Sequence, residues 1–465
     1  MDPYQARQSG RKAAARSVAR QAKEAVVAIR LPSSRTARAA HRVDLCTAPA
    51  YSRGMMHATE RVDGLILQLE SMAHGGDAIA RHEGQVIFVR GGIPGEHVRA
   101  RVTERRARFL RAAVVEVLAP SPHRVTPPCP YVEHCGGCQW QHIAYAAQST
   151  IKTDIVEETL ARIGGLQAPP VAPALPAASP LGYRNHVQVR LASGGRLGFM
   201  ARESHHVVPI ERCLLAHPLA QARWEALREA RLSFQRAGLR VGVNTGESLV
   251  VLEGPQRPSA NHLPSGACAW AQGDAIHALR GNPWYHEELL GRRFRVSAGS
   301  FFQVHTAQAE ALVRVALEML APSPVDRVLD LYCGVGVFAL SVADQVEQVL
   351  GIESAGAAIS DARVNGGEQA NVRWHEDAAE NALADLRGRW TKAILDPPRA
   401  GCAEAVLTAL AQLEVERIVY VSCEPSTLAR DIARLGAWGY AVERIQPVDM
   451  FPQAFHVETV ALLRR

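Results

Sequence analysis

The sequence has little of what marks a membrane or secreted protein. None of its apolar runs approaches the length of about 18 uncharged residues that a membrane-spanning helix needs, so we expect no contact with a membrane. Its beginning lacks the apolar core and cleavage site of a signal peptide. The nine cysteines are an odd number, which argues against a disulfide framework. We therefore expect a cytoplasmic protein with reduced thiols, some of which bind a metal.

A general excess of basic residues is also missing. Residues 1–60 contain 11 Lys or Arg and four Asp or Glu, so this segment alone accounts for the formal charge of +6. The rest of the chain is close to neutral, and affinity for a nucleic acid would need a local basic patch. With 465 residues, 47% of them apolar, the chain is long enough for two to four globular domains.

Residues 1–60 are rich in Arg, Ala, Ser and Gln and show little apolar periodicity, which predicts a disordered extension. Three interpretations remain open: a basic tail that adds affinity for nucleic acid, a transit peptide, or a start placed too early, with Met55 or Met56 as the first residue. We favour the third, because ordered patterning begins just after these methionines.

Residues 61–120 show the pattern of a small all-β domain. Short apolar runs are separated by turns such as Gly75-Gly76 and Pro94-Gly95. The segment from Arg99 to Arg111 holds six arginines, one acid and an interleaved Phe109. A basic β-barrel of this kind is suited to binding a phosphate backbone, although a solvated charged hairpin would have the same composition.

Three cysteines stand close together in a C-x5-C-x2-C pattern. They are Cys129, Cys135 and Cys138. A fourth ligand is needed, and Cys213 is the nearest downstream cysteine, while His134 and His142 are alternatives. Four thiolates suit a [4Fe–4S] cluster or a structural zinc ion. Because the spacing is not that of a zinc ribbon, we predict an iron–sulfur cluster in a mixed α/β domain that spans residues 121–296.

Two further features belong to this central domain. The pattern from Ala144 to Ile163 predicts a helix, which Gly164-Gly165 ends. Arg184 and Asn185 lie on a predicted strand and could face a nucleic acid, while a surface salt bridge is the alternative for Arg184.

From residue 297 the pattern changes to alternating strands and helices. The strand from Val328 to Tyr332 is followed by the glycine turn Cys333–Gly336 and a helix. A second strand, Val349 to Ile352, ends at Glu353, an acid placed to bind ribose hydroxyls. A third glycine and a phosphate-binding lysine are missing, so S-adenosylmethionine fits this site better than a dinucleotide.

Two more predicted strands end in reactive groups. The strand from Ala393 to Leu395 runs into Asp396-Pro397-Pro398-Arg399, a rigid edge for an active site or merely a strand-ending turn. The strand from Ile418 to Val421 ends near Cys423, and Pro425 opens a helix. We expect the positive end of this helix to lower the pKa of Cys423 and so produce a nucleophilic thiolate. A buried, inert cysteine is the alternative.

The last apolar segment carries a carboxylate. His456 to Leu463 alternates and predicts a final edge strand of the sheet. Glu458 stands on it between Val457 and Val460, where a carboxylate is costly unless it has a partner or a function. Near a thiolate, such a group is a plausible general base.

Five ordered segments, together with the cysteine pattern, resemble the RNA uracil-C5 methyltransferase family over residues 61–465. They are AGSFFQVH (298–305), DLYCGVGVFAL (330–340), DPPRAG (396–401), SCEPSTLARD (422–431) and FHVETVALL (455–463). The resemblance implies an α/β fold with a Rossmann-like S-adenosylmethionine methyltransferase domain over residues 297–465. It also implies an OB-like TRAM barrel at the N-terminal end and a central domain with a [4Fe–4S] cluster.

The same resemblance implies a mechanism. Cys423 would add to C6 of a uracil, C5 would take the methyl group of S-adenosylmethionine, and Glu458 would remove the C5 proton. The positions that match the family's cofactor-binding residues are Gln303, Tyr332, Glu353 and Asp396, with Asp377 as a weaker candidate for the adenine end. The subgroup with both a TRAM domain and a cluster resembles enzymes that act on 23S rRNA.

Alternatives remain for the substrate and for the function itself. The same reaction on tRNA is one, and an RNA-binding iron–sulfur protein without activity is another. The chain departs from the family pattern at Glu424 and His305, where Asn is usual, and at Val337, where a polar residue is frequent. The C-x5-C-x2-C spacing argues against a radical S-adenosylmethionine enzyme, and we expect a monomer.

Overall fold

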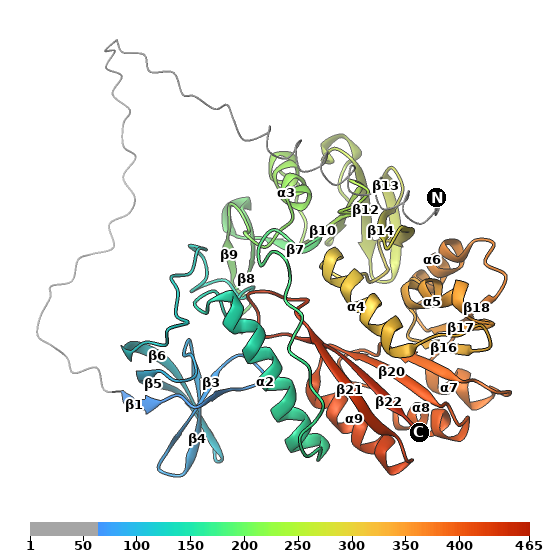
Figure 1. The fold of residues 1–465 in the computed structure, drawn as a ribbon. Helices are drawn as coiled ribbons and strands as arrows, with labels where there is room; N and C mark the ends of the chain where they lie inside the picture. Colours follow the sequence, from blue (N-terminus) through green and yellow to red (C-terminus); the bar gives the residue numbers. More distant parts are fainter. Residues whose placement is uncertain (1–63) are drawn as a thin grey trace, which may run out of the picture. The chain divides into compact units, whose positions relative to one another are not determined.

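A computed structural model describes residues 64–465, so the predictions for residues 1–60 lie outside the described part of the chain (Figure 1). Residues 64–465 belong to one compact unit, whose parts are distinguished by their sheets. Within the described residues, no helix is long and apolar enough to cross a membrane.

The first part is a six-stranded sheet with the order β1-β5-β6-β4-β3-β2. Its strands are β1 (Leu65–Gln68), β2 (Ser71–Met72), β3 (Ala78–His82), β4 (Gln85–Arg90), β5 (His97–Arg105) and β6 (Phe109–Ala119). Alternate residues such as Ile87 and Val89 are fully buried, as the period of a strand requires. The predicted all-β module is therefore present, and its arginine-rich segment forms the β5–β6 hairpin.

Helix α2 (Tyr145–Gly164) follows the cysteine-rich loop and matches the predicted helix closely. Gly165 ends it in the left-handed conformation, at φ 68°. In Figure 1 the helix runs alongside α9, and its Val156 and Leu160 belong to the same apolar cluster as residues of the last sheet. Its buried Lys152 donates to Asp449 Oδ1 at 2.5 Å, which ties α2 to the C-terminal part of the chain.

The central part is a seven-stranded sheet with the order β13-β12-β11-β10-β7-β8-β9. It contains β7 (His186–Leu191), β8 (Leu197–Met200), β9 (Val207–Pro209), β10 (Arg236–Val241), β11 (Ser248–Glu253), β12 (Ala267–Gln272) and β13 (Ala275–Arg280). Its helices are α3 (Pro218–Ala230) and the short 3₁₀ turns η1 (Ser193–Gly195) and η2 (Ala260–His262). The hairpin β14 (Trp284–Leu289) and β15 (Arg292–Ser297) follows it. These strands and helices make the central part α/β, as predicted.

The last part is a seven-stranded sheet with the order β18-β17-β16-β19-β20-β22-β21. Its strands are β16 (Arg327–Leu331), β17 (Gln348–Glu353), β18 (Val372–Glu376), β19 (Lys392–Leu395), β20 (Arg417–Ser422), β21 (Ala441–Val448) and β22 (Glu458–Arg464). Its helices are α4 (Thr306–Leu320), α5 (Val337–Val342), η3 (Ala343–Gln345), α6 (Gly356–Gly366), α7 (Ala379–Ala384), α8 (Glu404–Gln412) and α9 (Pro425–Ala437). The first five strands in the sheet order are parallel, and β22 is antiparallel to both of its neighbours.

The prediction that the final strand lies at the edge of the sheet is wrong. Strand β22 is inserted between β20 and β21, and it is buried from Glu458 to Leu463. The edge strand is β21, which carries Pro447, a residue that a sheet accepts most readily at its edge. The position of Glu458 inside the sheet makes it a more deeply buried carboxylate than an edge strand would.

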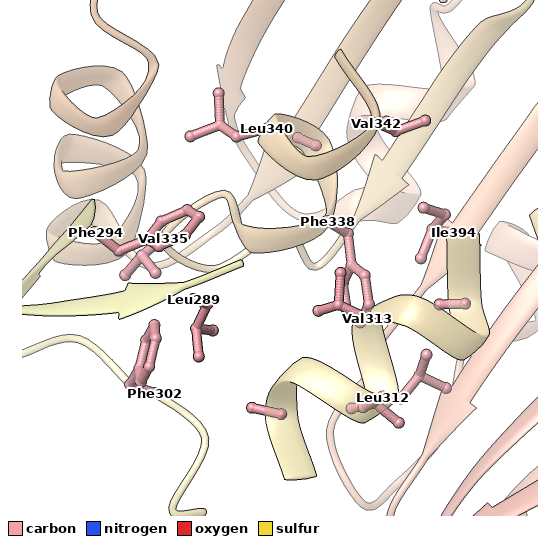
Figure 2. Close-up of a cluster of buried hydrophobic side chains, with 14 of the residues drawn as sticks. Leu289, Phe294, Phe302, Leu312, Val313, Val335, Phe338, Leu340, Val342 and Ile394 are labelled. Atoms are coloured by element: carbon pink, nitrogen blue, oxygen red, sulfur yellow. The ribbon is translucent and has the colours of Figure 1, made fainter. Parts of the chain in front are cut away.

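Alternate residues of the sheet pack into two different cores. Ile394 of β19 belongs to the cluster with α4 and α5, whereas Leu395 belongs to the cluster with α8 and α9. Figure 2 shows part of the first cluster, where Phe338 of α5 points toward Leu312 and Val313 of α4. This core also forms a wall of the cavity described below.

Candidate active site

A cavity of about 840 Å³ opens at the carboxyl ends of the parallel strands. Open α/β sheets bind their ligands at this edge, at the point where the order of the strands reverses. The seven residues predicted to bind the cofactor or to act in catalysis all line this cavity: Gln303, Tyr332, Glu353, Asp377, Asp396, Cys423 and Glu458. Strand β22 starts at this edge because it runs antiparallel to β20, so Glu458 faces the same space as Cys423.

The glycine turn after β16 gives a ligand close access to the backbone. Tyr332 has φ 63°, and Gly334 and Gly336 also have positive φ angles. A side chain at Gly336 would stand 2.6 Å from Trp374, so glycine is required at this position. Glu353 accepts hydrogen bonds from the N–H groups of Gly334, at 3.0 Å, and Ala355, at 2.7 Å, which fixes its carboxylate at the end of β17.

The opposite wall of the cavity is apolar. Its residues Phe302, Leu312, Val313, Val335 and Phe338 belong to the buried core shown in Figure 2. Rigid packing behind the cavity holds this wall in place. An acidic side next to an apolar side suits an amphiphilic, positively charged ligand.

The acids of the cavity have raised pKa values. Burial, together with the nearby Glu353, raises the pKa of Asp396 to about 7. Burial and the charge of Asp396 raise the pKa of Glu458 well above its usual value, although Arg399 opposes this. Asp330 lies directly behind, fully buried, and burial raises its pKa to about 8. The floor of the site thus holds more carboxyl groups than it can ionise without a bound cation.

Cys423 stands between β20 and α9, as predicted, but its predicted low pKa is wrong for the ligand-free protein. Burial raises the pKa of this thiol to about 11, and the charges of Glu458 and Asp396 add to the effect. Arg399 lowers it through its charge and a hydrogen bond, but not enough to compensate. The low dielectric and the buried acids therefore outweigh any effect of the helix end.

Arg399 is one residue of the site to which the sequence argument gave no role of its own. It lines the cavity, and its charge favours the ionised forms of both Cys423 and Glu458. The hydroxyl of Thr427 donates to its backbone carbonyl at 3.1 Å, which joins the Asp396–Arg399 turn to α9. The available signal was its place three residues after Asp396, in a turn that two prolines stiffen.

Phe301 is a second residue of this kind. It lines the cavity, yet 69% of its surface is exposed. A large exposed aromatic ring at a cavity of this kind offers a stacking surface to a flat ligand. In the sequence it stands two residues before Gln303.

Glu424, the residue after Cys423, connects this cavity with the β1–β6 sheet. Nε2 of His74 lies 2.9 Å from Oε1 of Glu424, and the hydroxyl of Ser426 donates to the same oxygen at 2.5 Å. Burial raises the pKa of Glu424, but these two partners outweigh it and lower the pKa to about 2. Trp140, just after the cysteine-rich loop, makes a further contact with this sheet, since its indole N–H donates to the carbonyl of Gly76 at 3.1 Å.

His305 and Val337, the other two residues that depart from the family pattern, have local roles. His305 begins α4, where its Nδ1 accepts a hydrogen bond from the backbone of Gln308 at 3.4 Å, and its ring stacks on Tyr183 at 4.5 Å. Val337 opens α5 and lines the cavity, where it contributes to the apolar side.

The four cysteines predicted to bind a metal line a second cavity, of about 540 Å³. Cys129, Cys135 and Cys138 come from the loop before α2, and Cys213 comes from the segment after β9. Burial raises the pKa of Cys138 to about 12, and the other three thiols add to this shift, so all four lie within electrostatic range. Neither alternative ligand, His134 or His142, lines this cavity.

Backbone N–H groups contact two of these thiols. The N–H of Gly137 donates to Sγ of Cys135 at 3.4 Å, and backbone N–H groups also lower the pKa of Cys213. A side chain at Gly136 would stand 2.9 Å from the carbonyl of Met200, so the loop needs glycine here. Among residues 64–465, however, no group of three His, Cys, Asp or Glu side chains is arranged to hold a metal ion.

Comparisons with known proteins agree with this geometry. Residues 288–465 match the family tRNA (Uracil-5-)-methyltransferase, and residues 65–115 match the TRAM domain. An uncharacterized RNA methyltransferase of Thermosynechococcus vestitus is 38% identical over 85% of this chain and 97% of its own length. One from Streptomyces coelicolor is also 38% identical, over 85% of this chain and 92% of its own.

A solved structure resembles the chain over most of its length. It is the Pyrococcus abyssi tRNA (uracil-54, C5)-methyltransferase in complex with S-adenosyl-L-homocysteine, with a TM-score of 0.69 and 27% identity. The match covers 86% of this chain and 99% of that one. The fold, the cavity and these relatives lead to one conclusion: the chain belongs to the family of S-adenosylmethionine-dependent RNA uracil-C5 methyltransferases.

Proposed function

We propose that the protein forms 5-methyluridine by covalent catalysis, with Cys423 as nucleophile and Glu458 as general base. The observation that carries this proposal is that both side chains line one cavity with the residues predicted to bind the cofactor. The charge of Glu458 raises the pKa of Cys423, so the two groups lie within electrostatic range.

The chemistry follows from the weakness of uracil C5 as a nucleophile. The thiolate of Cys423 forms a bond to C6, and the electron pair of the C5–C6 double bond moves toward the carbonyl at C4. C5 would then take the methyl group of S-adenosylmethionine, and the electron pair of the broken S–CH3 bond would stay on sulfur, so that neutral S-adenosylhomocysteine leaves. Glu458 takes the proton from C5, and the bond between C6 and sulfur breaks to restore the double bond and the thiolate.

The charges of the site fit these steps. A cation bound beside Asp396 would lower the pKa of that acid, and its charge would also help Glu458 to ionise. Arg399 would stabilise the thiolate of Cys423, since its charge already lowers the pKa of that group. We therefore propose Arg399 as a third member of the catalytic group.

For the cofactor, we propose that Glu353 binds the ribose hydroxyls. Gln303, Tyr332 and Asp396 would surround the methionine part, and Asp377 would lie near the adenine. All of these residues line the cavity, and Glu353 ends the second parallel strand, the usual place of a ribose-binding acid. A fall in cofactor affinity on Glu353→Gln, measured by calorimetry, tests this arrangement.

For the substrate, we propose 23S rRNA, on the combined presence of the TRAM domain and the cysteine-rich loop. One observation favours tRNA instead: the Pyrococcus abyssi enzyme that acts on tRNA covers 86% of this chain, so a chain of similar architecture serves tRNA there. Release of tritium from RNA labelled at uracil C5 decides between them. Release from rRNA alone supports our proposal, and release from tRNA alone replaces the substrate while keeping the chemistry.

For the second cavity, we propose that Cys129, Cys135, Cys138 and Cys213 bind a [4Fe–4S] cluster that stabilises the fold. The support for this proposal is that the four thiols line one cavity and that the C-x5-C-x2-C spacing is not that of a zinc ribbon. Protein prepared without oxygen should be brown, and Cys138→Ser should bleach it. A colourless protein with one equivalent of zinc would overturn the proposal.

A further inference from the structure

Arg184 lies where the two cavities meet. It lines both the catalytic cavity and the cavity of the four cysteines. Its backbone is fixed on both sides, since its N–H donates to the carbonyl of Leu215 at 2.8 Å and its own carbonyl accepts from His217 at 2.9 Å.

The neighbours of Arg184 anchor it to the catalytic part of the chain. The hydroxyl of Tyr183 donates to the carbonyl of Pro452 at 3.1 Å, and the side chain of Asn185 donates to the carbonyl of Gln303 at 3.0 Å. Arg184 therefore has a defined place relative to the cofactor-binding loop.

Its charge lowers the pKa of the Cys213 thiol but has no carboxylate partner in the described part of the chain. Within residues 64–465 no carboxylate lies within ion-pair distance of Arg184, and its buried Nε has no hydrogen-bond partner. A half-buried guanidinium whose Nε has no acceptor is costly, so its position favours an anion that comes from outside the chain. The predicted alternative, a surface salt bridge, is wrong.

The charges of the catalytic cavity show which anion this is. Acids line the cofactor side of the cavity, and its basic lining residues are Arg184 and Arg399. Arg399 is already engaged with Cys423 and Glu458. A uridine that enters the cavity brings its phosphate groups with it, and the acidic side repels them.

We propose that Arg184 binds a backbone phosphate of the target nucleotide and so positions its uracil over Cys423. This inference rests on the proposed function and specifies how the RNA is held. A planar guanidinium can take two phosphate oxygens at once, which fixes orientation as well as distance.

The test compares Arg184→Gln with Arg190→Gln, which removes the same charge from strand β7 but lies outside both cavities. RNA affinity is measured by fluorescence anisotropy over a range of salt concentrations. For Arg184→Gln we expect affinity to fall about 10- to 100-fold, and the slope of log K against log salt to fall by about one. The control should keep most of its affinity.

A second experiment changes the RNA instead of the protein. Single methylphosphonates are placed along the RNA around the target uridine, and each removes one phosphate charge. At one position the wild type should lose affinity, while Arg184→Gln should lose nothing more, because the contact is already absent. If every neutral phosphate weakens both proteins equally, Arg184 binds no particular phosphate and the proposal is overturned.

Two other outcomes separate this inference from what it rests on. A loss of bound metal on Arg184→Gln, with the salt slope unchanged, would show that Arg184 serves the cysteine cavity and overturn the phosphate contact. The wild type could instead bind RNA with a salt slope that depends on Arg184 but release no tritium from uracil C5. That result would overturn the proposed reaction alone.

Discussion

Glu458→Gln separates the two halves of the proposed reaction. The substitution keeps the size of a side chain that is 3% exposed and begins β22, but removes the base. Loss of a general base costs about 10²- to 10⁴-fold in turnover. Because elimination requires removal of the C5 proton, the covalent adduct between Cys423 and the methylated RNA should accumulate.

The first half of the reaction should respond in the opposite direction. With a pKa of about 11, Cys423 is ionised in roughly one molecule in a thousand at pH 8. At pH values where Glu458 is ionised, its charge is the largest electrostatic cause of this raised value, and each unit by which its removal lowers the pKa of Cys423 gives about ten times more thiolate. Glu458→Gln should therefore form its adduct at a lower pH than the pH at which turnover by the wild type begins.

Denaturing gels of labelled RNA, run over a series of pH values, measure both effects. Glu458→Gln combined with Cys423→Ala should give no adduct, and the exposed Glu368→Gln should behave as wild type. An adduct-free Glu458→Gln, or one whose adduct follows the pH profile of the wild type, would refute the reasoning.

Three further predictions concern single side chains. Lys152→Met leaves the fully buried Asp449 without its ion-pair partner, so the free energy of unfolding in urea should fall by about 3–5 kcal/mol, and less for the double variant with Asp449→Leu. Glu424 is 22% exposed and has a pKa of about 2, so its contribution to stability is complete above pH 4.5 and is lost progressively as the pH falls toward 2. Glu424→Gln should therefore cost about 2 kcal/mol of unfolding free energy at pH 7. In a pH series of melting temperatures, the difference between variant and wild type should vanish between pH 4.5 and pH 2. Cys423→Ala should abolish tritium release while RNA affinity in anisotropy stays within about twofold; retained turnover would exclude it as nucleophile.

Local patterns were enough to place much of the candidate site. Glu353, Asp396 and Cys423 each follow an apolar run, and parallel strands bring such ends to one edge of a sheet. The structure brings them together in one cavity because this geometry needs only strand identity and direction. The C-x5-C-x2-C spacing likewise predicted that three cysteines lie in one loop, because residues so close in the sequence cannot lie far apart in space.

What the sequence by itself determined, then, are the elements, their order and the reactive groups at their ends. Only the tertiary structure decided that β22 lies inside the sheet, that Arg399 and Glu458 act on Cys423 in opposite directions, and that Arg184 lies between two cavities. The reason is physical: a pKa and an unpaired charge depend on burial and on neighbours far away in the chain, and these exist only once the strands have paired.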